Sequence, residues 1–168
     1  DRRVEDTFFL TVGIEVDQRL LPTEKGVSIR PGARLAPGIR MDGTGRVFGR
    51  PQRVGTYAGE VQICRGRVCS PERVTFVVLR NVPWAPSVLT FPGRVGEQIS
   101  GDIRISGGPT GVPPTFTVTD PAALPPGVTI GPDGHVGGVP TTPGVSRVPV
   151  RVCLAGNCAG VVVTLIIV

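Results

Sequence analysis

The sequence has little of what helices, membrane spans and nucleic-acid surfaces require. Among its 168 residues are one histidine and one methionine, and aromatic residues make up only 5%. A glycine or proline occurs every few residues, 24 and 18 in all, so no window is long enough for a helix of period 3.6. The most apolar run, residues 161–168, is far shorter than the ~20 residues of a spanning helix. No phosphate loop before a helix and no ladder of stacking aromatics is present.

Short runs rich in Val, Ile, Leu and Thr lie between the turn residues. They alternate in polarity, as in GEVQIC (59–64), RVTFVVL (73–79), TFTVT (115–119) and RVPVRVC (147–153). Alternation with a period of two is typical of strands with one buried face. With 40% apolar residues the chain can also bury a core, so the sequence predicts an all-β protein with many turns.

Positive charge is concentrated in the first half. Residues 1–80 hold 14 Lys and Arg against 9 Asp and Glu, whereas residues 81–168 hold 4 against 4. The only lysine is Lys25, so the charge is nearly all arginine. One interpretation is arginine scattered over solvated strand faces, and the other is a contact face for an acidic polymer or an anionic surface.

The most informative feature is an internal repeat. Residues 35–69 align with residues 124–158 without a gap at an offset of 89, and 11 of 35 positions are identical. The identical positions are mainly turn formers and cysteines, which include the pairs Pro37/Pro126, Gly38/Gly127, Gly45/Gly134, Gly49/Gly138, Pro51/Pro140, Gly55/Gly144, Cys64/Cys153 and Cys69/Cys158. Two copies that share a backbone are expected to agree at such positions.

The repeat divides the chain into two domains, residues 1–80 and 81–168. Residues 80–87, RNVPWAPS, form the predicted linker, where Pro83 and Pro86 favour a stiff, extended connection. Trp84 lies within it. We expect Trp84 to pack at the junction of the domains; the alternative is an exposed anchor.

The repeated segment resembles the putative-Ig domains of bacterial surface proteins, related to cadherin-like domains of the dystroglycan type. Those modules carry Leu-Pro-Pro-Gly-Leu, a Gly turn, Gly-x-Pro and then Gly-x-Tyr. The second copy matches with residues 124–128, Gly134, 138–140 and Gly144, and the first copy with the equivalent positions through Tyr57. Residues 95–118 resemble the entry strand and Gly-Gly loop, of which the first copy lacks about six residues.

The resemblance implies an Ig-like β-sandwich in each half of the chain. It also implies a non-enzymatic, extracellular role as a spacer, adhesive or assembly module, and it supplies no catalytic residue. Many functions share such folds, so the resemblance identifies no ligand.

The four cysteines form two Cys-x4-Cys pairs at matching places in the repeat. Each pair follows an alternating strand and encloses a loop-sized segment, which places it across the mouth of a β-hairpin. We predict the disulfides Cys64–Cys69 and Cys153–Cys158. Closing so short a ring stabilises by ~2 kcal/mol, chiefly by fixing the hairpin register, and such bonds persist in an oxidising compartment. A zinc site is the competing reading, but the pairs are far apart and the spacing is wider than in zinc ribbons.

No candidate catalytic or metal site stands out. His135 lies in a Gly-rich turn beside Asp133, and the first copy has Arg46 in its place, so we interpret it as a surface turn residue. Calcium is an alternative at Asp42 and Asp133, each of which starts an Asp-Gly-type turn, although a turn role suffices for both. No carboxylate dyad is apparent. We therefore expect no enzyme and no cofactor.

The final run, VVVTLIIV (161–168), is apolar on both faces. A strand of that kind is normally covered on both sides, by a loop or the other domain, or by another subunit. Next to an open sheet edge it would suit strand addition between subunits, with residues 2–12 as a strand that could be donated. This hypothesis assigns assembly to one set of residues: Phe8, Phe9, Leu10, Val161, Val163, Leu165 and Ile167.

These observations lead to two functions. The first is a secreted or cell-surface structural protein whose tandem modules assemble into a filament, fibre or stalk. The alternative is an adhesin-type pair of modules, cut from a larger protein, that binds carbohydrate or another surface protein through Arg65 and Arg67. A start at Asp1 fits a mature secreted form with its leader removed.

Overall fold

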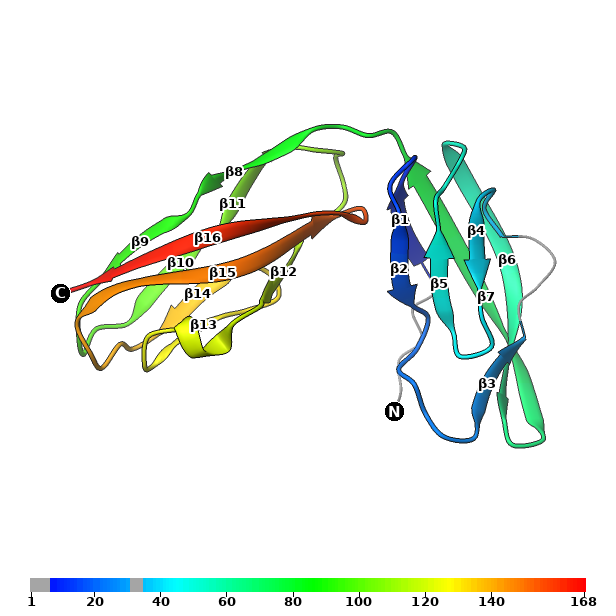
Figure 1. Ribbon diagram of the computed structural model, residues 1–168, viewed down its shortest axis with the longest axis horizontal. Coiled ribbons are helices and arrows are strands. Elements are labelled where there is room, and N and C mark those ends of the chain that lie inside the picture. Colours follow the sequence, from blue (N-terminus) through cyan, green and yellow to red (C-terminus); the bar gives the residue numbers. More distant parts are fainter. Residues whose placement is uncertain (1–6, 31–34) are drawn as a thin grey trace. The chain divides into compact units, whose positions relative to one another are not determined.

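A computed structural model describes residues 7–30 and 35–168, in which nearly all of the regular secondary structure is β-strand (Figure 1). The chain forms two compact units: unit 1 is Asp1–Asn81 with Ala155–Asn157, and unit 2 is Val82–Leu154 with Cys158–Val168. The one helical element in the described residues is a 3-10 turn, η1 (Pro121–Ala123). None of the described helical structure has the length and apolar character that crossing a bilayer requires.

Unit 1 is a sandwich of two sheets. Its strands are β1 (Thr7–Thr11), β2 (Val16–Arg19), β3 (Val27–Arg30), β4 (Ile39–Met41), β5 (Arg46–Gly49), β6 (Gly55–Arg65) and β7 (Val68–Leu79). One sheet has the order β1-β7-β6-β3 and the other β2-β5-β4. The predicted all-β fold is confirmed, because alternating residues of both sheets meet in one core.

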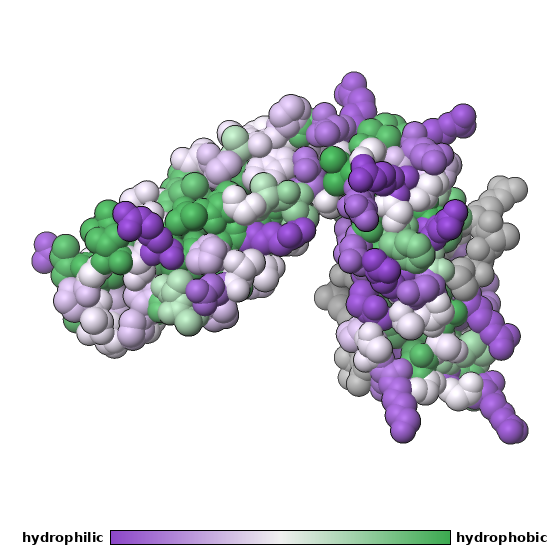
Figure 2. Space-filling model, viewed as in Figure 1, coloured by the Kyte–Doolittle hydropathy of each residue, from purple (hydrophilic) through white to green (hydrophobic). Residues whose placement is uncertain are grey.

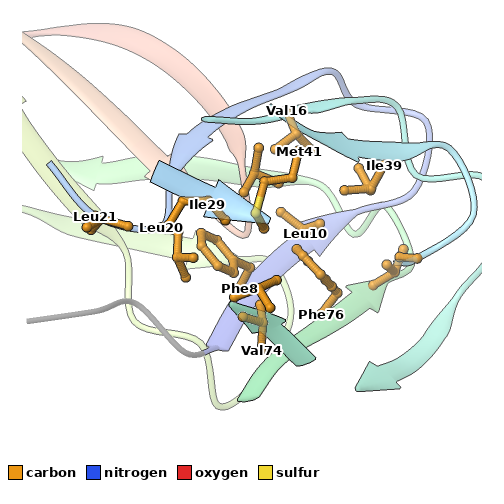
Figure 3. Close-up of a cluster of buried hydrophobic side chains, with 14 of the residues drawn as sticks. Phe8, Leu10, Val16, Leu20, Leu21, Ile29, Ile39, Met41, Val74 and Phe76 are labelled. Carbon is orange, nitrogen blue, oxygen red and sulfur yellow. The ribbon is translucent and has the colours of Figure 1, made fainter. Parts of the chain in front are cut away.

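The core of unit 1 consists of side chains from the inner faces of both sheets (Figure 3). Phe8 and Phe76 stack with their ring centroids 5.4 Å apart, and Leu10 and Val74 are fully buried beside them. Burial of each such side chain stabilises the fold by roughly 1.5–3 kcal/mol. Two of the residues that the sequence assigned to assembly, Phe8 and Leu10, therefore belong to the core of their own unit.

Unit 2 repeats this arrangement and adds a ribbon. Its strands are β8 (Trp84–Val88), β9 (Thr90–Gly93), β10 (Ile99–Asp102), β11 (Arg104–Gly107), β12 (Thr115–Val118), β13 (Val128–Ile130), β14 (His135–Gly138), β15 (Gly144–Leu154) and β16 (Asn157–Ile167). The sheets have the orders β12-β15-β16-β9 and β10-β14-β13, and β8 pairs with β11 in the added ribbon. The loop residues that the first copy lacks fall in the region of β11.

Alternation in β15 positions the core of unit 2. Val148, Val150 and Val152 are buried, whereas Arg151 between them is exposed, as the sequence predicted for residues 148–152. Trp84 opens β8 and packs, partly buried, against this core. Residues 84–87, which the sequence placed in the linker, thus form most of a strand of unit 2.

Glycine is required where two backbone segments cross in each unit. Gly38 has φ +88°, and a Cβ there would overlap the carbonyl oxygen of Arg50. Gly127 has the same φ, and its Cβ would overlap the carbonyl oxygen of Val139. This crossing explains why the motif pairs a Pro-Gly segment with a Gly-x-Pro segment, since only glycine allows both the left-handed backbone and the close approach.

Each unit has one long hairpin that is closed by a disulfide. Cys64–Cys69 links β6 to β7 and Cys153–Cys158 links β15 to β16, both with a Cα–Cα distance of 4.0 Å. The predicted disulfide-closed hairpins are confirmed. The turns differ, because in unit 1 only the first central residue, Gly66, has positive φ.

In the turn between β15 and β16 both central residues, Ala155 (φ 50°) and Gly156 (φ 74°), have positive φ. The first turn fits type II′ and the second type I′.

The first strand of each unit lies parallel to the last. Thr7–Thr11 of β1 pairs with Thr75–Leu79 of β7, and β9 pairs with residues 164–167 of β16. The strand at residues 2–12 was predicted to be free for donation. Residues 2–6 lie outside the described part of the chain, and residues 7–11 already pair within unit 1.

Candidate interaction surfaces

The outer face of β16 is apolar and faces solvent. Val162 is 51% exposed and Ile166 40%, and beyond the strand Val168 is 69% exposed. On the neighbouring strand Val145 is 59% exposed. In Figure 2 hydrophobic residues gather over the part of unit 2 where Figure 1 draws β9 and β16. We call Val145, Val162 and Ile166 the apolar strip.

The assembly residues named from sequence on β16 belong to the opposite face. Val163, Leu165 and Ile167 are buried in the core of unit 2, and Val161 packs against it, partly buried. The assignment of these side chains to a partner surface was therefore wrong, because they already fill the interior of their own sandwich. Phe9 differs from its neighbours in β1 and is 36% exposed.

The open edge expected beside β16 is present along only part of the strand. β16 lies between β15 and β9, so residues 164–167 are paired on both sides. β9 pairs only with the part of β16 that begins at Thr164. Within residues 7–30 and 35–168, no strand pairs with that side of β16 before Thr164.

Unit 1 carries polar residues at two of the three positions that correspond to the apolar strip. At the offset of 89, Val145 corresponds to Thr56 and Val162 to Arg73, both exposed. Thr56 and Val77, the counterpart of Ile166, are cross-strand partners. The apolar strip is thus a property of unit 2 rather than of the shared fold.

A basic cluster lies at the hairpin tip of unit 1. Arg65 and Arg67 are exposed there, as expected for the proposed ligand contact. The N–H of Gly66 donates a 3.0 Å hydrogen bond to the carbonyl oxygen of Gly26, which brings the exposed Lys25 to the same tip. Sequence reasoning missed Lys25, because it is about 40 residues from the tip in the chain. Only the pairing of β3 with β6 brings Lys25 close to Arg65 and Arg67.

The two Asp turns are organised by the aspartate side chains. Oδ1 of Asp42 accepts hydrogen bonds from the Thr44 hydroxyl at 2.6 Å and from the N–H groups of Thr44 and Arg46 at 2.9 and 3.1 Å. The Thr44 hydroxyl and then the Arg46 N–H lower the pKa of Asp42. Asp133 repeats part of this pattern, with its Oδ1 accepting from the N–H of His135 at 3.1 Å. Both residues act as turn formers.

The arrangement of acidic side chains does not support a calcium site at these two turns. The described residues contain no group of three or more His, Cys, Asp or Glu side chains that could hold a metal ion. A calcium site takes six or more oxygen ligands, and each turn brings a single carboxylate.

Arg46 and His135 occupy matching positions in the smaller sheets, and each contacts an aspartate of the neighbouring strand. In unit 1 Nε of Arg46 lies 2.9 Å from Oδ1 of Asp17, and this contact lowers the pKa of Asp17. In unit 2 Nδ1 of His135 lies 3.1 Å from Oδ1 of Asp102. A histidine–aspartate pair can serve a nucleophile, but no hydroxyl or thiol hydrogen bonds to His135 among the described residues. The two pairs differ in register, because Asp102 lies directly opposite His135, whereas Asp17 lies opposite Phe48, two residues from Arg46.

A hollow of about 570 Å³ opens at one end of unit 2. Phe91, Ile99 and Val168 line it, together with Arg94 and Glu97. Gln98 and Ser100 line it as well, so the hollow brings together a single carboxylate and a single hydroxyl group.

Comparisons with known proteins do not identify a family. No protein-family model and no curated protein matches the sequence. Among solved structures, human protocadherin-24 EC1-2 is 8% identical, with 97% of this chain and 95% of that chain covered and a TM-score of 0.39. Drosophila N-cadherin EC1-4 is 15% identical, with 100% and 49% covered and a TM-score of 0.37.

A third solved structure is an enzyme. An endo-fucoidan hydrolase of glycoside hydrolase family 107 is 12% identical, with 99% of this chain and 28% of that chain covered and a TM-score of 0.42. The chain thus spans little more than a quarter of the hydrolase. Similarities this distant identify no function for the chain.

Proposed function

We propose that the chain is a pair of non-enzymatic β-sandwich modules from an extracellular protein, and that unit 2 mediates association with further copies of the chain. The observation that carries the proposal is the apolar strip, which exposes three aliphatic side chains on the outer face of a sheet. Exposed apolar surface of this kind is stabilised when a partner covers it. A secreted or cell-surface location is supported by the disulfides, which include all four cysteines.

Charge favours association between copies of unit 2 over association between copies of unit 1. Residues 81–168 carry four positive and four negative side chains, whereas residues 1–80 carry a net +5. Two copies of unit 2 can therefore approach without net repulsion. Repeated contacts between copies would build the structural assembly, filament or stalk that the sequence suggested. Another surface protein with an apolar face is the other partner that fits.

The test is sedimentation velocity over a wide concentration range, with the Val145→Lys variant. Wild type is expected to associate, and the lysine to raise the dissociation constant roughly tenfold or more, because it places a charge within an apolar contact. Thr56→Lys is the matched control, since it makes the same change at the corresponding position of unit 1. A wild type that stays monomeric at every concentration would contradict the proposal.

A second candidate function is favoured by the basic cluster. Lys25, Arg65 and Arg67 at one tip suit an acidic carbohydrate, which would be held by charge-assisted hydrogen bonds. The experiment is elution from an immobilised sulfated polysaccharide in a salt gradient. Arg67→Glu is expected to elute at much lower salt, whereas Arg40→Glu, which makes the same change in charge at an exposed position on β4, is expected to shift it less. Equal shifts would indicate a net-charge effect without a site.

A further inference from the structure

The two sheets of unit 2 carry opposite charge. The strands of the sheet β12-β15-β16-β9 contain Arg147 and Arg151 and no acidic residue, whereas the strands of the sheet β10-β14-β13 contain Asp102 and neither lysine nor arginine. A second acid, Asp133, lies in the turn between β13 and β14, where its Oδ1 accepts from the N–H of His135. The sandwich is therefore basic on one face and acidic on the other, although its charges sum to zero.

The two arginines share the outer face of their sheet with the apolar strip. Arg147 and Arg151 are exposed and alternate with buried valines along β15, which places them on the same side of the strand as Val145. Four residues of a strand span about 13 Å, so the two positive charges are spread along the strip. Neither arginine forms an ion pair with another described residue, and both are available to a partner. We call this surface the basic apolar face, which consists of Val145, Arg147, Arg151, Val162 and Ile166.

The outer side of the opposite sheet has small side chains at its centre. Gly137 of β14 lies opposite Ser100 of β10 and Thr129 of β13, so the middle of this sheet presents two hydroxyl groups and a bare backbone. A Cβ at Gly137 would lie 3.4 Å from the ring of His135, which borders the glycine on one side. Aliphatic side chains of another sheet can approach such a floor closely. We call Ser100, Asp102, Thr129, His135 and Gly137 the acidic face.

The described strands of unit 1 show no such separation of charge. In its smaller sheet Phe48 stands where unit 2 has Gly137, and the guanidinium carbon of Arg46 lies 5.0 Å from the centroid of that ring. Arg19, Arg40 and Arg46 accompany the single aspartate of that sheet. In the larger sheet, β6 and β7 each carry both signs of charge. The basic apolar face and the acidic face are thus properties of unit 2.

We infer that copies of the chain associate head to tail, with the basic apolar face of one unit 2 packed on the acidic face of the next. The inference rests on the proposed self-association and names the second face and the symmetry of the contact. Two basic apolar faces in contact would bring four arginines together, two from each copy, and like charges in an interface oppose association. The acidic face supplies both the opposite charge and a floor for the aliphatic side chains.

Contact between two different faces makes the association open-ended. A stack of copies keeps one free face of each kind at its two ends, so a further copy can add in the same geometry. The expected product is a filament, or a ring where the rotation between copies closes, whereas two like faces would stop at a dimer. Added salt is expected to weaken the contact, because it includes exposed charges.

The first test reverses the charge of the acidic face. Asp102→Arg is expected to raise the dissociation constant roughly tenfold or more, because it places an arginine opposite two others. Asp120→Arg is the matched control, since it makes the same change in charge at an exposed residue outside both sheets, and is expected to change the constant less than about threefold. Sedimentation equilibrium measures both, and the emission of Trp84 verifies that unit 2 is folded. Thr129→Arg is a second variant that adds a charge to the acidic face without removing the contact between His135 and Asp102.

A mixture of two variants tests the head-to-tail arrangement. Val145→Lys disables the basic apolar face and Asp102→Arg the acidic face, so each variant alone is expected to be largely monomeric. Mixed in equal amounts, the two retain one competent face each and are expected to form a 1:1 dimer of twice 17.6 kDa that does not grow with concentration. Pairing of like faces predicts no such recovery, because Asp102→Arg would then associate like wild type and Val145→Lys would stay monomeric.

The outcomes separate this inference from the proposed function. Growth of wild type beyond a dimer, a loss in Asp102→Arg that Asp120→Arg does not share, and recovery in the mixture support the head-to-tail contact. A wild type that stops at a dimer, with Asp102→Arg unaffected, overturns the contact and leaves the proposed function standing. Equal losses in Asp102→Arg and Asp120→Arg also overturn it, since net charge would then decide association. If wild type stays monomeric at every concentration, both fall.

Discussion

Unit 1 and unit 2 share their strand order, disulfide position and backbone crossing, but their last strands present different chemistry to solvent. Where β7 has Pro71 and Arg73, β16 has Gly160 and Val162. The residues that agree between the units are those with a backbone requirement, such as Gly38 and its counterpart. The comparison teaches that a small set of turn residues and cysteines specifies this fold, which leaves the outer strand faces free to carry separate functions.

The largest effect is expected when the backbone crossing that both units share is disrupted. Gly38→Ala and Gly127→Ala are each expected to destabilise their own unit by about 3 kcal/mol or more, because each adds a backbone overlap to an unfavourable φ. Urea unfolding resolves the units, since the only tyrosine, Tyr57, belongs to unit 1 and the only tryptophan, Trp84, to unit 2. Gly96→Ala is the control, with φ +83° and open space around its Cβ. A cost at Gly127 no larger than that at Gly96 would show that the crossing is not limiting.

A second test asks whether the disulfides contribute equally. Both join cysteines five residues apart, so their loop-closure terms are the same. Replacing either pair by alanine is expected to lower the free energy of unfolding of that unit by about 2 kcal/mol. Urea titrations with the same two probes measure the effect, and reduced wild type should reproduce both losses. A difference above about 1 kcal/mol between the units would break the equivalence of the hairpins.

The hairpin turns allow a smaller test. Ala155 has a left-handed backbone that costs an alanine roughly 1 kcal/mol relative to glycine. Ala155→Gly is therefore expected to stabilise the β15–β16 hairpin by about that amount, and Gly66→Ala to destabilise the β6–β7 hairpin similarly. Thermal unfolding followed by Trp84 and Tyr57 compares them. Destabilisation by Ala155→Gly would indicate that the methyl group matters more than the φ angle.

The smallest expected effect is the pH dependence of the stability of unit 1. In unit 1 the pKa of Asp17 is lowered by the hydrogen bond and charge of Arg46, so its carboxylate stabilises the fold above the unfolded pKa near 4. This contribution is lost as the pH falls through the lower pKa of the folded state. Asp17→Asn is expected to lower the urea midpoint of unit 1 slightly at pH 7 and not at pH 2. Equal shifts at both pH values would mean that the ion pair is not responsible.

The turns, the disulfides and the all-β fold were predictable, because they depend on residues with local backbone requirements. Gly38 and Cys64 illustrate this, since each recurs at the offset of 89. The inward face of β16 was not recognised from VVVTLIIV, because both of its faces are apolar. The missing signal lay in the first copy, where Arg73 and Thr75 mark the outer face and correspond to Val162 and Thr164.

Contacts between distant segments were beyond sequence reasoning. The parallel pairing of β1 with β7 joins residues nearly 70 positions apart, and no local pattern encodes it. The same applies to the Asp102–His135 pair and to the place of Lys25 beside Gly66. These contacts follow from how whole strands pair, which is decided by burial of the two sheets against each other.

The parallel pairing of first and last strands also determines how each unit responds to mechanical tension. Because β9 and β16 run in the same direction, the chain passes from β8 into β9 at Thr90 and reaches the end of β16 beside Gly93. A pull on the two ends acts along these strands, and loads the hydrogen bonds at Thr164 and Val168 in shear, all at once instead of one after another. A module with this connection can extend a tether without coming apart strand by strand.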